Sequence, residues 1–578
     1  MPLDSLQRGN RIQNIATFLE DMVRDSAPEN VCQTIELRRK EDAFADARMF
    51  FKDRAWLASQ SGQDFVRELA NNPSIADVYV KPTTLSLRVS DQLIADLSKD
   101  FETSNAASLN VSDLLPDKRF VVGFVGPNIS KALHIGHLRN LAIGNALSSI
   151  LETAGAQVVR QSLVGDIGRN VCEAMAGYKR LHDGEDPLTL GVKPDHFVGN
   201  IYADYNRTYN CQRFLGDAPF DPIVRETEVV NDLADSFMRR WLAGDLEVNE
   251  LWRQVKYWVM SGHRDTLSRL GLTIARHDFE SDSVADIEQL MKRMLSDGIV
   301  STDPSGRIVY VSGRSEFEVM ILVRDDGFPT EHARLVAVYC RLFDELNGNS
   351  TYLDLAGTEW QPASGLHMEL VRRVLSSKVE ETHVQLFHGM VTINDAKMAS
   401  RDGQAILIDN LLDQLLQSPQ VQSLSESTQG AVTVETVADI VVKGFFVCRP
   451  TMKPLEFSWS KLMNEKQNPG WLIAHALCHA RSLQPTGASA PGINDAVHRL
   501  ALIRSQDFRR NIRQATLTYS LSGLTSYLIH LCEVFLDRPK DVHLTRVMQE
   551  LLDATLSSLG LLSTASHGQT LSMGARVD

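Results

Sequence analysis

The chain of 578 residues has a formal net charge of −14, and 43% of its residues are apolar and 23% charged, as in an ordinary globular protein. Its length exceeds what one hydrophobic core usually supports, so we expect two or three domains. The acidic balance argues against a protein that binds polyanions without selectivity, although a local basic face can still bind nucleic acid.

Signals for export, membrane insertion and structural metal are also missing from the sequence. The first residues, MPLDSLQRGNRIQN, lack an apolar stretch, and no apolar run approaches the roughly eighteen residues that span a membrane. The seven cysteines are scattered and form no CxxC pair, which speaks against a disulfide framework and a zinc ribbon. We therefore expect a cytoplasmic protein with no membrane partner and no metal-ligating residues.

Residues 1–115 have the pattern of a small α+β module. Apolar residues at 12–22 recur at steps of three and four, as on one face of a helix. We expect two short strands and a helix to follow, at 78–80, 85–89 and 91–97. The polar stretch 104–113 then marks the first domain boundary.

Between residues 116 and 430, strand-like runs alternate with helical segments, which is typical of an α/β domain. The expected strands are 120–124, 158–163, 308–311, 319–323, 352–355 and 384–387. A helix is expected over 137–153, with Ala154-Gly155 as its stop. A mostly helical insertion near 175–295 interrupts the alternation, and its sequence indicates no site.

From residue 431 to the end we expect helices and no further strands. The loop-like stretch 484–494 separates a helix over 471–483 from a basic helix over 498–513. The basic helix carries five arginines, Arg499, Arg504, Arg509, Arg510 and Arg513, and taken alone such a helix is usually a solvated face.

The stretch FVGPNISKALHIGHLRN, residues 124–140, joins a predicted strand to a predicted helix. A helix N-terminus presents free N–H groups and partial positive charge, so anions bind there readily. Gly136 permits close approach of a ligand, and Lys131, His134 and His137 add hydrogen-bond donors. We interpret the turn as a site for nucleotide phosphates, although two histidines near a helix start, taken alone, are more often packing or surface residues.

A second basic stretch, AKMASRDG at 396–403, places Lys397 and Arg401 on a loop between a strand and a helical segment. Taken alone, it is typical of a solvated loop. In this order and on these elements, the two stretches resemble the HIGH and KMSKS signatures of class I aminoacyl-tRNA synthetases.

The surrounding residues resemble the arginyl-tRNA synthetase family in particular. Residues 128–140 are similar to its SPNxAKxxHxGHLRS block, and VGDIG at 164–168 is similar to its VGDWG. Further similar blocks are HGMV at 388–391, PLEF at 454–457, NP at 468–469 and LCHAR at 477–481. Ser400 replaces the second Lys of KMSKS, and Lys131 matches the Lys that the family carries just before HIGH instead.

This resemblance implies a Rossmann-like catalytic domain of class I at 116–430, within an α/β fold. It also implies that the α+β module at 1–115 contacts the tRNA body and that an all-helical domain at 431–578 is of the anticodon-binding type. In such a domain the basic helix either contacts tRNA phosphates or forms a solvated face, and the two interpretations are evenly matched. The candidate tRNA contacts are Arg499, Arg509, Arg510 and Arg513. The implied reaction is ATP-dependent activation of arginine and its transfer to tRNA, with Mg²⁺ accompanying ATP. We expect a monomer that binds no DNA.

The family's site residues carry over to matching positions. His134 and His137 would hold the phosphates, Lys131 and Lys397 would offset developing charge, and Arg401 would fix the loop. The resemblance adds further residues that contact ATP, namely Gly136, Gly389, Met390 and Val391. Asn128 and Asp325 would bind the amino acid.

Two positions depart from the family's amino acid pocket. Gly123 stands where the family has a Glu, and Ile321 stands where it has the Tyr of a Tyr-x-x-x-Asp motif that ends at Asp325. A guanidinium buried with one carboxylate in place of two is under-compensated, unless Asp326 or Glu331 supplies the charge. Two alternatives therefore stay open: a paralogue that adenylates another amino acid or uses another acceptor, and a tRNA- or nucleotide-binding protein with little catalysis.

Overall fold

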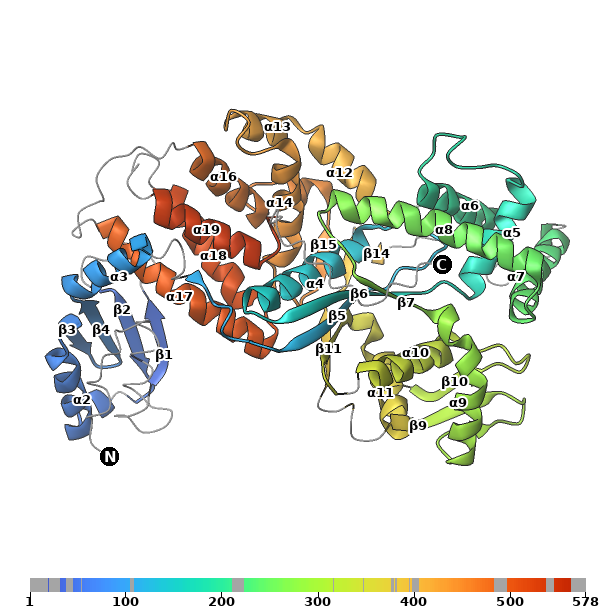
Figure 1. Cartoon of the computed structure of the whole chain (residues 1–578), viewed down its shortest axis with the longest axis horizontal. Helices are drawn as coiled ribbons and strands as arrows, with labels where there is room; N and C mark the ends of the chain where they lie inside the picture. The colour runs from blue at the N-terminus through green and yellow to red at the C-terminus, as the bar shows by residue number, and fades with distance from the viewer. Residues whose placement is uncertain are drawn as a thin grey trace.

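The structure is a computed structural model. It describes residues 19, 32–37, 45–53, 55–103, 109–209, 223–314, 317–346, 348–375, 379, 382–393, 396–397, 405–482, 496–536 and 545–562. Figure 1 shows an N-terminal module at one end of the long axis, a helical insertion at the other, and a parallel sheet between them. Helices of the C-terminal part pack between the N-terminal module and this sheet.

The N-terminal module is built on a four-stranded antiparallel sheet in the order β1-β2-β4-β3. Its elements are β1 (Cys32–Leu37), β2 (Ala47–Phe51), α2 (Gln60–Asn71), β3 (Ile75–Lys81), β4 (Thr84–Val89) and α3 (Asp91–Thr103). Both predicted strands and the predicted helix at 91–97 are confirmed, whereas β1 and β2 were not predicted. The helix predicted at 12–22 lies outside the described residues, apart from the buried and helical Leu19.

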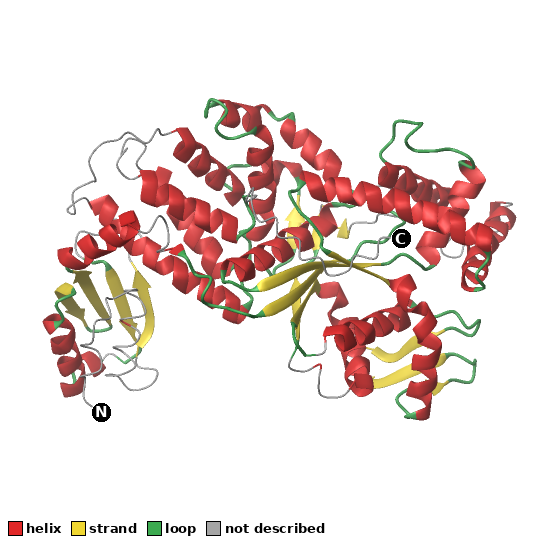
Figure 2. Ribbon diagram, viewed as in Figure 1, coloured by secondary structure: helices red, strands yellow, loops and turns green. Residues whose placement is uncertain are grey.

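The central sheet has five parallel strands in the order β12-β11-β5-β6-β7 (Figure 2). They are β5 (Arg119–Val125), β6 (Gln157–Val164), β7 (Arg276–Phe279), β11 (Thr351–Gly357) and β12 (His383–His388). The four strands predicted at these places are confirmed. The sequence analysis missed β7 because its four residues, RHDF, include three polar ones and have no apolar run.

The strands predicted at 308–311 and 319–323 exist, but they do not continue the parallel sheet. They belong to β9 (Ile308–Arg314) and β10 (Phe317–Val323), which form a separate antiparallel sheet with β8 (Ser301–Thr302). The short connection between β9 and β10 permits a hairpin, whereas a parallel pair needs a crossover of a dozen or more residues. Helices α9 (Val284–Ser296), α10 (Glu331–Leu346) and α11 (Gln361–Leu375) pack with this sheet.

The helical insertion consists of α5 (Arg169–Leu181), α6 (Pro194–Tyr209), α7 (Ile223–Leu242) and α8 (Leu246–Arg269). These helices share a core that includes Tyr205 and Trp258. The chain then returns to the central sheet as β7, inside the range 175–295 that the sequence analysis assigned to the insertion.

The C-terminal part is mostly helical, as predicted, but the expectation that strands stop near residue 430 is wrong. Strand β15 (Leu455–Phe457) pairs in parallel with β13 (Val391–Ile393), which also pairs with β14 (Ala396–Lys397). Three residues are too few to show a period in the sequence. The helices are α12 (Ile408–Leu416), α13 (Pro419–Glu426), α14 (Val434–Val447), α15 (Trp459–Met463), α16 (Pro469–Ser482), α17 (Ala496–Thr518), α18 (Ser522–Leu536) and α19 (Thr545–Ser558).

Helices α16 and α17 confirm the two helices predicted at 471–483 and 498–513, and the predicted loop 484–494 lies outside the described residues. Among the described residues, no helix combines the length and the apolar character needed to cross a membrane.

Candidate active site

Two histidines cap the start of α4 (Ile135–Thr153), at the turn that follows β5. His134 is the N-cap, and its Nδ1 accepts a hydrogen bond from the backbone N–H of Gly136 at 3.1 Å. Nδ1 of His137 accepts one from the backbone N–H of His134, also at 3.1 Å. The predicted helix therefore begins two residues early, because the histidines form a reciprocal cap of the kind that Ser and Glu usually form.

The burial and hydrogen bonds of the two imidazoles determine their protonation state and which nitrogen carries the proton. Burial, together with the nearby charge of Lys131, lowers the pKa of His134 to about 3. Burial also holds the pKa of His137 well below its usual value, so both rings are neutral at neutral pH. A neutral ring whose Nδ1 accepts must carry its proton on Nε2. The turn thus keeps two Nε2–H donors that the cap does not use, on rings 4.0 Å apart.

Asn128 and Lys131 belong to the same turn. The side-chain oxygen of Asn128 accepts from the N–H of Ser130 at 3.1 Å, and its backbone bridges to Gly165 of the VGDIG segment. The carbonyl oxygen of Lys131 lies 2.9 Å from Nε2 of His263 on α8. The structure therefore brings together Asn128, Lys131, Gly136 and both histidines, as the sequence predicts.

Arg139, on the first turns of α4, fixes the HGMV segment to this site. Its fully buried guanidinium donates to the carbonyl oxygens of Gly389, Thr451 and Lys453 at 2.6, 3.0 and 2.9 Å. A Cβ on Gly389 would lie 2.3 Å from the backbone of Lys453, so this close approach needs glycine. The predicted ATP contacts Gly389, Met390 and Val391 are thus held beside α4. The sequence analysis missed Arg139, because an arginine near a helix start is usually solvated.

The AKMASRDG stretch is described only at its borders. Lys397 lies in β14, opposite Thr392, and Arg401 lies outside the described residues. On the far side, the carbonyl oxygen of Ile406 accepts from the N–H of Ile135 at 2.9 Å. The stretch therefore leaves from β14 and returns to the turn that holds the two histidines.

Asp166 ties the VGDIG segment to the insertion. One of its oxygens accepts from Nζ of Lys256 at 2.7 Å and from Oγ of Ser281 at 2.6 Å. The other accepts from the backbone N–H of Ser281 at 2.9 Å. Asp166 is fully buried, so a positioning role is the one its contacts support.

One group of side chains has the spacing of a metal site, namely Asp195, His196 and Asp409. A cation is already present there, because Nζ of Lys193 lies 3.0 Å from Asp195 and 2.8 Å from Asp409. Nη1 of Arg269 adds a second positive charge 2.8 Å from Asp409. We interpret the group as an ion cluster that fastens the insertion to α12.

The amino acid side of the site is built around Gly123. In the register of the parallel sheet, Gly123 lies between Asp354 of β11 and Gln161 of β6. A Cβ at position 123 would lie 2.4 Å from the hydroxyl of Tyr352 and 2.7 Å from Oε1 of Gln161. These neighbours fill the space that a side chain at 123 would need.

The other two pocket positions inferred from the sequence lie elsewhere. Ile321 is in β10, part of the separate antiparallel sheet. Asp325 lies on the exposed turn after β10, where its carboxylate accepts from the N–H of Asp326 at 3.1 Å. No described interaction links Asp325 to Gly123, and its role as a ligand stays a prediction.

The basic helix α17 carries the four arginines predicted to contact tRNA. Arg499 is buried, and its guanidinium donates to Asp46 at 2.6 Å and to Asp91 at 2.8 Å, both in the N-terminal module. Arg510 donates to the carbonyl oxygen of Ile35 at 2.9 Å, and Arg509 pairs with Asp113 at 2.5 Å. Arg513 is exposed. Helix α17 thus joins the N-terminal module to the rest of the chain, and a tRNA role for these arginines stays a prediction.

Comparisons with known proteins agree with this geometry. Residues 103–444 match the family model "tRNA synthetases class I (R), catalytic domain". The chain is 24% identical over 500 residues to the arginine–tRNA ligase of Amoebophilus asiaticus, with 80% of each chain covered. It is 28% identical over 369 residues to that of Treponema pallidum, which covers 62% of this chain and 59% of the relative.

Solved structures show the same fold. The arginyl-tRNA synthetase of Thermus thermophilus superposes with a TM-score of 0.67 at 17% identity, covering 95% of this chain and 99% of that one. The enzyme of Plasmodium falciparum gives 0.64 at 12% identity, covering 95% and 97%.

Proposed function

This chain belongs to the class I arginyl-tRNA synthetase family, and on that basis we propose that it activates arginine with ATP and transfers the arginyl group to tRNA. The carboxylate of arginine attacks the α-phosphorus of ATP and pyrophosphate leaves. The resulting adenylate then acylates the 3′ end of tRNA and releases AMP. Such chemistry needs positioning and charge neutralisation more than a strong general base.

The observation that carries this proposal is the reciprocal histidine cap. Because Nδ1 of each ring is committed to the backbone, each Nε2–H is a preorganised neutral donor at a helix N-terminus. Lys131 adds positive charge close enough to lower the pKa of both rings. Phosphate oxygens fit this donor set, because they accept hydrogen bonds and carry negative charge.

Mg²⁺ fits the site as a companion of ATP. The turn at residues 126–140 contains no carboxylate, and the acidic cluster at Asp409 already holds Lys193 and Arg269. We infer that the ion is bound by the phosphates and water, which Mg²⁺ prefers to all-protein cages. It would supply further charge neutralisation, and Lys397 and Arg401 would do so from the loop.

We also propose that the N-terminal module contacts the tRNA body and that the C-terminal helices bind the anticodon side. The contacts of Arg499 and Arg510 with the module support a fixed spacing between these two parts. The protein would act as a monomer in the cytoplasm, where translation uses charged tRNA. Light scattering of the purified chain, alone and with tRNA, tests whether the protein is a monomer.

The proposed reaction is tested by exchange of labelled pyrophosphate into ATP, with each amino acid and with and without tRNA. Exchange with arginine, followed by charging of tRNA, is the expected result. The absence of exchange under every condition would contradict the proposal. It would favour a protein that binds tRNA or nucleotide with little catalysis.

One observation favours a second candidate, adenylation of a different amino acid. The space for a carboxylate at position 123 is filled by Tyr352 and Gln161. In the same assay, exchange with another amino acid and none with arginine would establish this second candidate.

A further inference from the structure

Helix α8 of the insertion carries three polar side chains on consecutive turns of one side. They are His263, Thr266 and Arg269, spaced three residues apart. His263 and Thr266 are buried. Figure 1 shows α8 running from the outer part of the insertion to α12. Because buried polar groups are nearly always hydrogen-bonded, the partners of these side chains show what α8 holds in place.

The first of them, His263, bonds directly to the histidine turn (residues 131–137). Its Nε2 lies 2.9 Å from the carbonyl oxygen of Lys131, and a carbonyl oxygen only accepts, so Nε2 carries a proton. Burial lowers the pKa of His263, so the ring is neutral at neutral pH and donates through Nε2 alone. The insertion thus fixes the backbone of Lys131, the residue whose ammonium would offset developing charge.

The other two side chains hold Asp409, the second residue of α12. Oγ1 of Thr266 donates to one of its carboxylate oxygens and Nη1 of Arg269 donates to the other, both at 2.8 Å. Nζ of Lys193 on α6 adds a third contact at 2.8 Å. Burial disfavours the charge of Asp409, but hydrogen bonds from His196 and Lys193 lower its pKa, so the carboxylate is ionised. The start of α12 is therefore bound firmly to the insertion.

Asp409 follows directly on a segment that pairs with the histidine turn. The backbone of residues 406–408 joins that of residues 133–135 through two hydrogen bonds of 2.9 and 3.1 Å. The resulting antiparallel bridge places Leu407 opposite His134. A displacement of Asp409 would therefore be transmitted to the backbone on both sides of His134.

We propose that His263 and Asp409 are positioning residues for adenylation, through which α8 braces the histidine turn against the phosphates of ATP. His263 acts on the backbone of Lys131, and Asp409 acts on His134 through residues 406–408. A misplacement of about 1 Å can lower a rate about a hundredfold, so two anchors on one rigid helix matter for catalysis. This inference rests on the proposed function, and it gives the helical insertion a role in the reaction.

The first test measures pyrophosphate exchange with arginine, in the presence of tRNA, for Asp409→Asn. We expect kcat to fall about tenfold while the KM for arginine stays at the wild-type value, because the anchor acts on the phosphate side of the site. In the His134→Asn background, the same substitution should lower kcat by less than about threefold, since the ring that Asp409 positions is already gone. Losses that simply multiply would mean that Asp409 acts independently of His134, and would overturn the proposal.

The second test compares two substitutions of His263. His263→Gln keeps an N–H donor near the place of Nε2, whereas His263→Leu keeps the bulk and removes the donor. We expect kcat to fall about tenfold in His263→Leu and to stay within about twofold of the wild type in His263→Gln. Equal values of kcat in the two folded variants would show that the bond to Lys131 does not position the turn.

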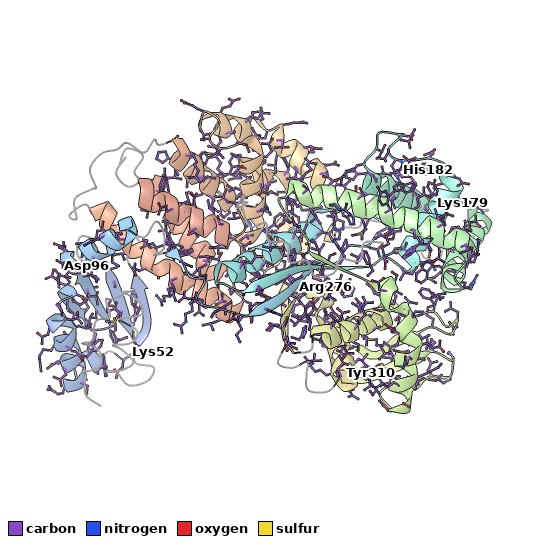
Figure 3. All side chains as sticks on the ribbon, in the orientation of Figure 1. Lys52, Asp96, Lys179, His182, Arg276 and Tyr310 are labelled. Atoms are coloured by element: carbon purple, nitrogen blue, oxygen red, sulfur yellow. The ribbon has the colours of Figure 1, made fainter. Side chains whose placement is uncertain are left out.

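His182→Leu is the matched control. His182 also belongs to the insertion, and its Nδ1 lies 2.8 Å from a carboxylate oxygen of Glu185. Figure 3 shows it at the outer side of the insertion, well away from Arg276 on β7 of the central sheet. Its substitution removes a histidine contact from the insertion without touching the histidine turn, so kcat should not change.

Thr266→Val replaces Asp409→Asn if that variant fails to fold, because it removes one donor from Asp409 and keeps the shape of the side chain. A fall of about threefold in kcat with an unchanged KM for arginine is then expected, and an unchanged kcat would overturn the proposal. A wild-type enzyme that exchanges with no amino acid contradicts the proposed function itself. A wild-type enzyme that exchanges with arginine, while folded Asp409→Asn and His263→Leu keep its kcat, overturns the positioning role of α8 alone.

Discussion

Nδ1 of His137 accepts a hydrogen bond from the backbone N–H of His134 at 3.1 Å, so His137 both caps α4 and points its other nitrogen away from the cap. The two roles can be separated by substitution. Asparagine can reproduce the Nδ1 acceptor but has no group at the place of Nε2–H, whereas alanine removes both.

We predict that His137→Asn and His137→Ala both lower the adenylation rate tens-fold or more, at about 1.4 kcal/mol per factor of ten. His137→Ala should also lower the free energy of unfolding by about 1 kcal/mol, because it removes the cap, and His137→Asn should lower it less. Exchange kinetics and urea unfolding measure the two effects. If His137→Asn exchanged at the wild-type rate, Nε2–H would not be a phosphate donor.

The pKa of His134 gives a prediction for stability against pH. Its pKa is about 3 in the folded chain and ordinarily 6.5, so between these values the unfolded chain binds the extra proton. Stability should therefore fall as the pH is lowered from 6.5 towards 3, by up to about 1.4 kcal/mol per pH unit from this group. The His134→Asn variant should show a shallower dependence in chemical unfolding at several pH values. An unchanged slope would mean that His134 is protonated in the folded chain.

Arg139 should matter for both stability and ATP binding. Arg139→Lys replaces a planar group that donates to several carbonyl oxygens with one compact ammonium, so some buried carbonyls lose their donor. We expect a loss of about 2–3 kcal/mol in the free energy of unfolding and a higher KM for ATP, since the segment at Gly389 is freed. Arg67→Lys, at an exposed position, is the control and should change neither quantity. An unchanged KM for ATP in Arg139→Lys would mean that the segment at Gly389 does not contribute to ATP binding.

The contrast between His137 and Arg139 explains how far the sequence could predict this site. The histidines, Lys131 and the order of the two signatures are local patterns, and four of the five central strands have clear apolar runs. Arg139 and Asp354 depend on partners brought together by the fold, and Asp354 meets Gly123 only through the register of β11 and β5. Strand β7 was missed because its polar residues, Arg276 and Asp278, pair with each other inside the fold. A sequence period cannot reveal such compensation.

The interface between α17 and the N-terminal module gives the last prediction. Arg499 is buried and donates to Asp46 and Asp91, so Asp46→Asn would remove the better buried of its two countercharges. Breaking a buried ion pair by removing one partner costs about 3–5 kcal/mol, and here the cost falls on the contact between two parts of the chain. We expect faster proteolysis between the module and the central sheet. The KM for tRNA should rise, while the KM for ATP should stay at the wild-type value.

Asp113→Asn breaks the exposed pair with Arg509 in the same interface and should have little effect. Equal proteolysis rates for the two variants would mean that Arg499 does not hold the module, and its guanidinium would then be free to serve tRNA phosphates instead.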